Sequence, residues 1–211
     1  MDMRFVKVTY DQFKKDFMEI NQIDESKSEN IDTKLREIYD GIKIPRRKTS
    51  GAAGYDFSAP YGFTLNKKES IVIPTGIRWV TDLGEDEPMP NLVLCMVPRS
   101  GSGTKYGVKL CNTLGIIDND YQLAKNTGHI LLKITNDGSG DSLCGVNIFD
   151  GNNVSTVTLS CKTITNPVFS VEAGDGIAQG IIFEFHTISN EIKPTESRNG
   201  GFGSTDVEKA K

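Results

Sequence analysis

The sequence predicts an all-β fold, either a β-sandwich or a jelly-roll-like β-barrel, that follows a short helical N-terminal extension. Three observations lead to this fold class. Beyond residue 41, short runs rich in valine, isoleucine, threonine and aromatic residues alternate with turn-forming residues, which is the pattern of strands joined by turns. The chain holds 21 glycines, enough to turn many short strands. Before residue 42, apolar residues recur at helical spacing instead.

The N-terminal segment predicts two short helices. Thr9 is followed three residues later by Gln12, which is the signature of a capping box at a helix N-terminus. Apolar residues then recur at near-helical spacing over residues 13–20. A polar stretch interrupts this pattern, and apolar residues resume it over residues 31–39, with Gly41 as the expected helix stop.

The remainder of the chain predicts strands. The strand-like runs cover residues 71–80, 91–97, 128–136, 152–160, 166–171 and 178–188. The expected organisation is a helical extension over residues 1–41, a barrel over residues 42–188 with an inserted hairpin at about 138–165, and a glycine-rich C-terminal arm over residues 189–211.

Composition restricts the classes of function. Lys and Arg number 24 against 28 Asp and Glu, a net charge of −4, so the chain lacks the concentrated basic surface that binding to duplex nucleic acid requires. The basic cluster at residues 43–48 is interpreted as a solvated strand end. No apolar run approaches the ~20 residues that cross a bilayer, and the N-terminus lacks the apolar core of a secretory signal. We therefore expect a cytoplasmic protein that contacts neither membrane nor nucleic acid directly.

The cysteines do not indicate a metal site. Cys95, Cys111, Cys144 and Cys161 include no Cys-x-x-Cys pair, and only two histidines accompany them. We expect all four cysteines to be reduced and structural, with Cys95 buried in its apolar run. The phosphate-binding loop of P-loop enzymes and the zinc-deaminase signature are also missing from the sequence.

Five short segments could carry chemistry. They are AGYDF, PRSG, GIIDNDY, GIAQG and RNGGFGST, at residues 53–57, 98–101, 115–121, 176–180 and 198–205. The second segment combines a guanidinium, a hydroxyl and backbone amides after an apolar strand, which suits the binding of phosphate oxygens. The third places two carboxylates and an aromatic ring close together. Taken one at a time, these segments could also be ordinary turns or linkers.

In this order, the five segments resemble the five motifs of the trimeric dUTPase family, nucleotide hydrolases that convert dUTP to dUMP and pyrophosphate. The resemblance covers roughly residues 42–205. It implies a jelly-roll barrel that assembles as a homotrimer, with active sites shared between subunits, dUTP as substrate and Mg²⁺ as cofactor. It also implies that the glycine-rich arm closes over the bound nucleotide as a lid, and that the enzyme keeps uracil out of DNA and supplies dUMP for dTTP synthesis.

The resemblance assigns the catalytic and uracil side of the site to residues near the third motif. Asp118 resembles the general base that deprotonates the water attacking the α-phosphorus. Tyr121 resembles the tyrosine whose ring packs against the deoxyribose and leaves no space for a 2′-hydroxyl. Asn112 and the hairpin backbone at Ile117 resemble the groups that hydrogen-bond the uracil edge. Asp120 is expected to be a hairpin carboxylate.

The resemblance assigns the phosphate side to the other motifs. Arg99, Ser100 and Gly101 match the second motif, which holds phosphate oxygens. Asp56 resembles the aspartate that contacts Mg²⁺ through water, and Gln179 resembles the glutamine near the α-phosphate. The match to the fifth motif gives Arg198 as the γ-phosphate ligand, Phe202 as the ring stacked on uracil, and Gly203, Ser204 and Thr205 as phosphate-side contacts.

The sequence departs from the family pattern in several places. Gly176 stands where an arginine is common, so a structural ion pair is expected to be missing. The fifth motif is one residue shorter than in many relatives, and residues 123–127 are an insertion after the third motif. The hairpin at 138–165 resembles inserts of some phage dUTPases. It is interpreted either as the site of a protein contact or trimer packing, or as a neutral surface hairpin.

Two alternative functions stay open at this point. The first is a dCTP deaminase-type enzyme, alone or bifunctional, which shares the barrel and the trimer; the tyrosine of the third motif and the phenylalanine of the fifth are features of dUTPases instead. The second is a nucleotide-gated regulatory binding protein that keeps the pocket and works through a partner.

Overall fold

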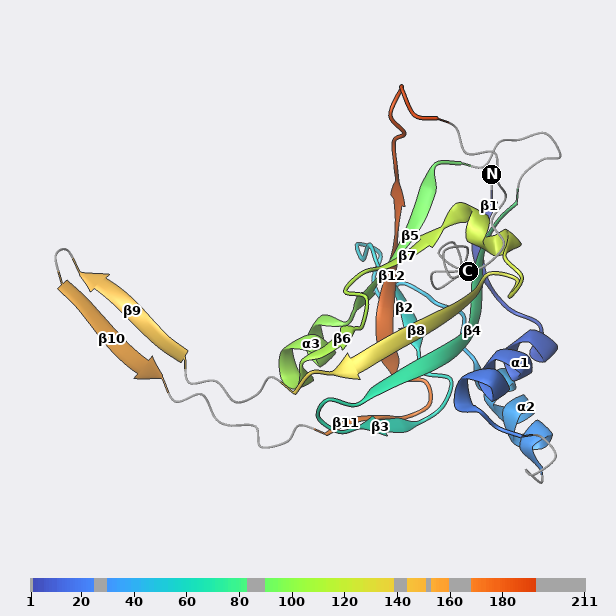
Figure 1. Ribbon diagram of the computed structural model, residues 1–211, viewed down its shortest axis with the longest axis horizontal. Coiled ribbons are helices and arrows are strands. Elements are labelled where there is room, and N and C mark those ends of the chain that lie inside the picture. The colour runs from blue at the N-terminus through green and yellow to red at the C-terminus, as the bar shows by residue number, and fades with distance from the viewer. Residues whose placement is uncertain are drawn as a thin grey trace, which may run out of the picture.

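The computed structural model describes residues 2–24, 30–82, 90–138, 144–150, 153–159 and 168–192 (Figure 1). Its helices are α1 (Tyr10–Asn21), α2 (Ile31–Gly41), α3 (Ser100–Tyr106) and the 3-10 helix η2 (Asn119–Leu123). Its strands are β1 (Asp2–Lys7), β2 (Tyr55–Ser58), β3 (Phe63–Leu65), β4 (Ser70–Asp82), β5 (Leu92–Pro98), β6 (Val108–Leu110), β7 (Gly115–Asp118), β8 (His129–Asn136), β9 (Cys144–Asp150), β10 (Asn153–Leu159), β11 (Phe169–Val171) and β12 (Gly176–Glu184). The chain is mostly β-sheet, which confirms the all-β prediction. Among the described residues, no helix is long and apolar enough to span a membrane.

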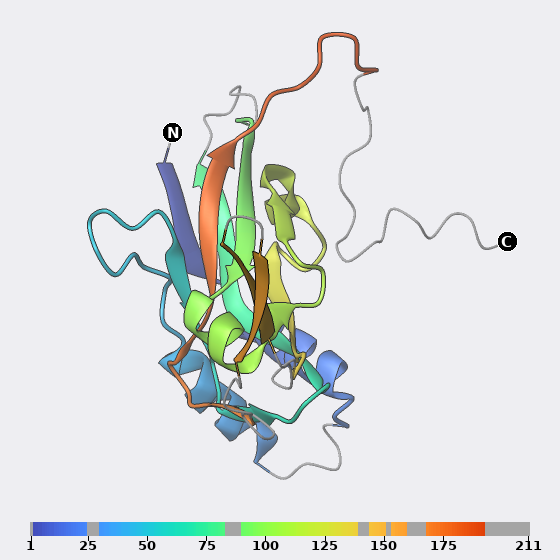
Figure 2. The same cartoon turned by 90° about the vertical axis from the view of Figure 1, so that its left-hand side faces the viewer.

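Two four-stranded sheets form the body of the molecule (Figures 1 and 2). One sheet has the strand order β1-β4-β8-β6 and the other the order β2-β12-β5-β7, with antiparallel pairing throughout. Two smaller antiparallel pairs, β11-β3 and β10-β9, complete the strands. In both views α1 and α2 lie side by side at the lower end of the sheets, where α1 contacts β4. This arrangement is consistent with the predicted jelly-roll-like architecture.

A single hydrophobic core joins both sheets to the N-terminal helix. Leu94 of β5, Ile130 of β8 and Phe13 of α1 are all fully buried members of this core. Burial of a side chain of this size contributes about 1.5–3 kcal/mol relative to exposure. A 12-residue helix is only marginally stable alone. The apolar face of α1, packed on the sheets, therefore holds the helix in place.

The start of α1 is as predicted, because Thr9 is the N-cap and its Oγ1 accepts a hydrogen bond from the Gln12 N–H at 3.2 Å. The second helix ends at the predicted glycine. The prediction of a helical extension is wrong for residues 2–7, which form β1 and pair with β4, Phe5 opposite Trp79. An isolated helical turn is costly to nucleate, whereas the edge of β4 offers this stretch a row of backbone partners.

The predicted strand runs all contain strands, namely β4, β5, β8, β10, β11 and β12. Strand β12 ends at Glu184, short of the predicted residue 188. The prediction omits β2, β3, β6 and β7, whereas β9 falls within the predicted hairpin. Several of these have only three or four residues, which is too short for a period of two to stand out.

The segment before β11 contains a hairpin, as predicted: β9 and β10 pair antiparallel along their whole length. Where this segment leaves the barrel, Asp137 accepts hydrogen bonds from Lys68 Nζ at 2.7 Å and from Lys109 Nζ at 2.9 Å. These two ammonium groups lower the pKa of Asp137 to about 2. The carboxylate thus links the start of the insert to β6 and to the turn before β4.

Candidate active site

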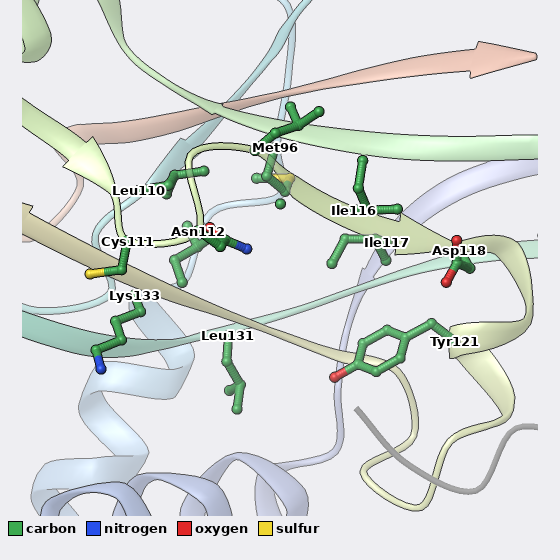
Figure 3. Close-up of a pocket in the computed structure, with 13 residues that line it drawn as sticks. Met96, Leu110, Cys111, Asn112, Ile116, Ile117, Asp118, Tyr121, Leu131 and Lys133 are labelled. Atoms are coloured by element: carbon green, nitrogen blue, oxygen red, sulfur yellow. The ribbon is translucent and has the colours of Figure 1, made fainter. Parts of the chain in front are cut away.

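A pocket of about 570 Å³ opens beside β7 (Figure 3). Most of its lining is aliphatic. Three of the predicted polar groups reach it from separate elements: Asn112 from the turn before β7, Asp118 from the end of β7 and Tyr121 from η2. The predicted backbone at Ile117 also lines it. A concave and largely apolar pocket with a few convergent polar groups is typical of a small-molecule site.

Strand β7 holds Asp118 at the edge of this pocket. It pairs with β5, so that Gly115 lies opposite Met96 and Asp118 opposite Val93. A Cβ at Gly115 would lie 3.0 Å from Met96 Cβ, so the glycine permits the close approach of the two strands. Figure 3 shows the Asp118 carboxylate at the end of β7, at the same end of the pocket as Tyr121.

The ring of Tyr121 is part of the pocket wall, and the residue is only 6% exposed. Its hydroxyl donates a hydrogen bond to His129 O at 3.0 Å and accepts one from Asn126 Nδ2 at 2.7 Å. Asn126 belongs to the inserted segment 123–127, which therefore folds back onto the tyrosine. A buried tyrosine usually needs such a hydroxyl partner, and here the partners also hold the ring in position.

A second pocket, of about 280 Å³, gathers the second and fourth motifs. Arg99, Ser100, Gly101 and Gln179 line it, so the structure brings together these four predicted residues. Lys105 of α3 adds a cation that sequence reasoning missed. Cationic side chains next to a hydroxyl are suited to phosphate oxygens.

Asp56 of β2 lies opposite Gln179 of β12 and is 9% exposed. Its Oδ1 accepts a hydrogen bond from Gln179 Nε2 at 2.9 Å, and Arg99 Nε lies 3.8 Å from the same oxygen. Lys48 Nζ lies 3.4 Å from Oδ2, yet this buried oxygen accepts no hydrogen bond from the described residues. An ion pair of this kind leaves a lone pair unsatisfied, which is costly for a buried carboxylate.

This carboxylate fits a hydrated Mg²⁺ ion better than a metal held by protein ligands alone. Among the described residues, no group of three or more His, Cys, Asp or Glu side chains could hold a metal ion. Mg²⁺ commonly keeps several waters and uses one or two carboxylates together with substrate phosphates. The buried Oδ2 of Asp56 accepts no hydrogen bond from the part of the chain that the structure describes, so it is an oxygen that such a water could satisfy.

Gly176 makes room for the Arg99 side chain. Arg99 Nη1 donates a hydrogen bond to Gly176 O at 3.3 Å, and a Cβ at position 176 would lie 2.5 Å from that nitrogen. The glycine that departs from the family pattern thus leaves space for a guanidinium that arrives from the second motif.

Asp118 and Arg99 lie at opposite ends of β5. Asp118 pairs with Val93 near the start of that strand, whereas Arg99 directly follows its last residue, Pro98. Six residues of extended strand at ~3.3 Å each separate Val93 from Arg99, which is roughly 20 Å. A triphosphate is much shorter than that, so one chain does not bring Asp118 and Arg99 to the same phosphate group.

Several predicted site residues fall outside the described ranges, and two residues that line the first pocket were not predicted. Arg198, Phe202, Gly203, Ser204 and Thr205 lie outside the described residues. Sequence reasoning missed Cys111 and Lys133, which line the first pocket. The signal for Lys133 was available, because a lysine that interrupts the apolar run 130–134 marks the face of the strand that points away from the core.

Known proteins that resemble this chain in sequence include dUTPases. A dUTPase family model matches residues 40–141. A relative from Lactococcus lactis, a deoxyuridine 5′-triphosphate nucleotidohydrolase, is 30% identical over 167 residues, which cover 78% of this chain and 89% of the relative. A dUTPase structure from Streptococcus mutans aligns with a TM-score of 0.49 at 24% identity, covering 72% of this chain and 91% of that one. The dUTPase of the Staphylococcus aureus phage phi11 aligns with a TM-score of 0.48 at 23% identity, covering 78% and 94%.

Proposed function

The chain belongs to the dUTPase family and is a dUTP diphosphatase, and we propose that it cleaves dUTP to dUMP and pyrophosphate with a water molecule activated by Asp118. The observation that supports this mechanism is the position of Asp118 on one pocket with Tyr121 and Asn112. A carboxylate acts as a general base when it holds the attacking water beside the reacting atom. In this reaction the water oxygen bonds to the α-phosphorus, the bond to the β-phosphate oxygen breaks, and the water proton passes to the carboxylate.

The first pocket would hold the deoxyuridine. Asn112 and the backbone at Ile117 would hydrogen-bond the uracil edge, and the Tyr121 ring would pack against the sugar. A ring fixed at its hydroxyl has little freedom to move away from a 2′-hydroxyl, so ribonucleotides would be rejected. Fixed donors and acceptors would likewise disfavour cytosine, because its exchanged donor pattern leaves groups of the protein unpaired.

The second pocket would hold the phosphates. Arg99 and Lys105 would offset phosphate charge, while Ser100 and the amide of Gly101 would donate hydrogen bonds to phosphate oxygens. Asp56 would hold Mg²⁺ through water, and the bound ion would supply charge neutralisation across the phosphates. Gln179 would position Asp56 through its hydrogen bond.

We also propose that the working enzyme is a homotrimer with shared sites. The separation of roughly 20 Å along β5 supports this proposal, because Asp118 of one subunit then needs Arg99 of another to complete a site. The Arg198 and Phe202 segment would close over the nucleotide as a lid. In the cell the reaction would remove dUTP before it enters DNA and would provide dUMP for dTTP synthesis.

Pyrophosphate release from dUTP, dCTP, dTTP and UTP in the presence of Mg²⁺ tests the proposal. Asp118→Asn should lower kcat for dUTP by about 10³, since general-base catalysis contributes typically 10²–10⁴. Binding of a non-hydrolysable dUTP analogue should stay within about threefold of wild type, because the isosteric amide keeps the shape of the site. Asp120→Asn, two residues away in η2, is the matched control and should remain active.

Three outcomes would contradict different parts of the proposed function. Full activity of Asp118→Asn would exclude Asp118 as the base. Deamination of dCTP would indicate the deaminase branch. Tight binding of dUTP by the wild type without turnover would indicate a nucleotide-gated binding protein.

A further inference from the structure

A carboxylate of α1 and an imidazole of β8 meet in the protein interior, away from the groups assigned to the reaction. His129 is 0% exposed and Asp16 is 8% exposed. The distance from His129 Nδ1 to Asp16 Oδ2 is 2.6 Å, and the same oxygen accepts a hydrogen bond from Gln12 Nε2 at 2.9 Å. Charged side chains are almost never buried unless they are paired. The pairing joins residues 113 positions apart in the chain.

The backbone of β4 determines which nitrogen of His129 carries the proton. The Gly76 N–H donates a hydrogen bond to His129 Nε2 at 2.8 Å, so Nε2 is the acceptor and Nδ1 bears the hydrogen that is donated to Asp16. Without the Asp16 acceptor, the Nδ1 proton would lose its partner. If the proton moved to Nε2 instead, two N–H groups would point at each other.

The backbone of His129 carries this constraint to the pocket. His129 O accepts a hydrogen bond from the Tyr121 hydroxyl at 3.0 Å and another from Asn126 Nδ2 at 3.2 Å. Just before it, Gly128 has φ +75°, and a Cβ there would lie 2.8 Å from Gln122 Cα. The chain therefore passes very close to η2 at this point, and a displacement of His129 is transmitted directly to the tyrosine.

We propose that Asp16 and His129 are positioning residues for Tyr121, so that helix α1 sets the sugar selectivity of the nucleotide pocket. The inference rests on the proposed function, in which Tyr121 excludes the 2′-hydroxyl. A fully satisfied buried network of this kind favours one arrangement of its members over all others. The N-terminal helix thereby contributes to substrate choice, although none of its side chains lines the pocket.

The test compares the substrate preference of variants that replace a buried or an exposed carboxylate of α1. Asp16→Ala should lower the preference for dUTP over UTP, measured as the ratio of the two kcat/KM values, about tenfold. The loss should appear chiefly as a higher KM for dUTP, with kcat changed less than about threefold. Asp16→Asn should keep the wild-type preference for dUTP over UTP, because the amide Oδ1 can still accept the hydrogen bond from His129 Nδ1. Asp11→Ala removes an exposed carboxylate of the same helix and should behave as wild type.

Nitrogen-15 NMR of the imidazole rings gives a readout that is independent of activity. The chain has two histidines, so His186→Gln leaves the signal of His129 alone. The wild type should show the proton on Nδ1. A proton on Nε2, or a folded Asp16→Ala variant with the wild-type KM and preference, would overturn the inference.

Two further measurements test the inference even if Asp16→Ala does not fold or the proposed function is wrong. If Asp16→Ala does not fold by circular dichroism, Gln12→Ala takes its place, since it removes one donor from the same carboxylate oxygen. It should lower the preference about threefold. If the wild type does not turn over dUTP, the proposed function fails. The ratio of dissociation constants for non-hydrolysable dUTP and UTP analogues then decides the inference, because it should still fall about tenfold in Asp16→Ala.

Discussion

Replacement of Gly76 by alanine tests how the N-terminal segment is attached to the barrel. Gly76 lies at an irregularity of β4 and has φ +71°, in the region that favours glycine. Its carbonyl accepts a hydrogen bond from the Val8 N–H at 3.0 Å, and its own N–H donates to His129 Nε2. An alanine Cβ would overlap Ile42 Cδ1 and lie 3.4 Å from Phe13 Cδ2.

The expected loss of stability has two parts. An L-residue in the left-handed region costs about 1–2 kcal/mol. Displacement of the buried Ile42 side chain from a packed core costs typically 1–3 kcal/mol. A total of about 3 kcal/mol corresponds to a Tm lower by roughly 6–12 °C in a chain of this size.

Thermal unfolding followed by circular dichroism at one fixed protein concentration measures this loss, because an oligomer's Tm depends on concentration. Gly51→Ala is the control: Gly51 is exposed, and no atom of the described residues lies within 4 Å of a Cβ placed there. Its Tm should change by no more than about 2 °C. A Gly76→Ala variant as stable as Gly51→Ala would refute the tight packing of the N-terminal segment against β4.

Three further predictions concern charge, the second pocket and thiol reactivity. The pKa of Asp137 is lowered to about 2, so its ion pairs stabilise the folded chain above about pH 4 and cease to do so as the pH falls through 2. The difference in Tm between wild type and Asp137→Asn should therefore shrink between about pH 4 and pH 2. Gly176→Ala should displace the Arg99 guanidinium, which its Cβ would meet at 2.5 Å, and raise KM for dUTP severalfold in steady-state assays. Cys111 is exposed and lines the first pocket, so iodoacetamide should alkylate it faster than Cys95, and dUTP should protect it in peptide mapping.

Each of these has a result that would contradict it. For Asp137, a Tm difference from Asp137→Asn that does not change between pH 5 and pH 2 would exclude the ion pairs as its source. For Gly176, an unchanged KM would show that the guanidinium can move at no cost to substrate binding. For Cys111, equal labelling with and without nucleotide would place the substrate elsewhere; burial, which raises the pKa of the Cys95 thiol, should keep that residue slow in both cases.

The motif residues could be predicted because five short segments of the chain resemble, in order, the motifs of the dUTPase family. Asp118, Tyr121 and Asn112 were predicted for one site, and the structure brings them to one pocket. The roles of Asp16 and His129 were not predicted. A signal was present, since Asp16 falls within the apolar stripe of α1, where a carboxylate requires a buried partner. The identity of that partner could not be derived from spacing along the chain.

The sequence by itself determined much of the local structure: the N-cap at Thr9, the two N-terminal helices and most of the longer strands follow from capping, periodicity and turn residues within a few positions of one another. The helices α3 and η2 were not predicted. Only the tertiary structure decided which distant residues meet. Asp56 and Gln179, 123 positions apart, share a hydrogen bond because β2 pairs with β12. Asp118 and Arg99 lie apart because one pairs near the start of β5 and the other follows its end. The physical reason is that these contacts depend on strand register and sheet order, which arise from the packing of the whole core rather than from local preference.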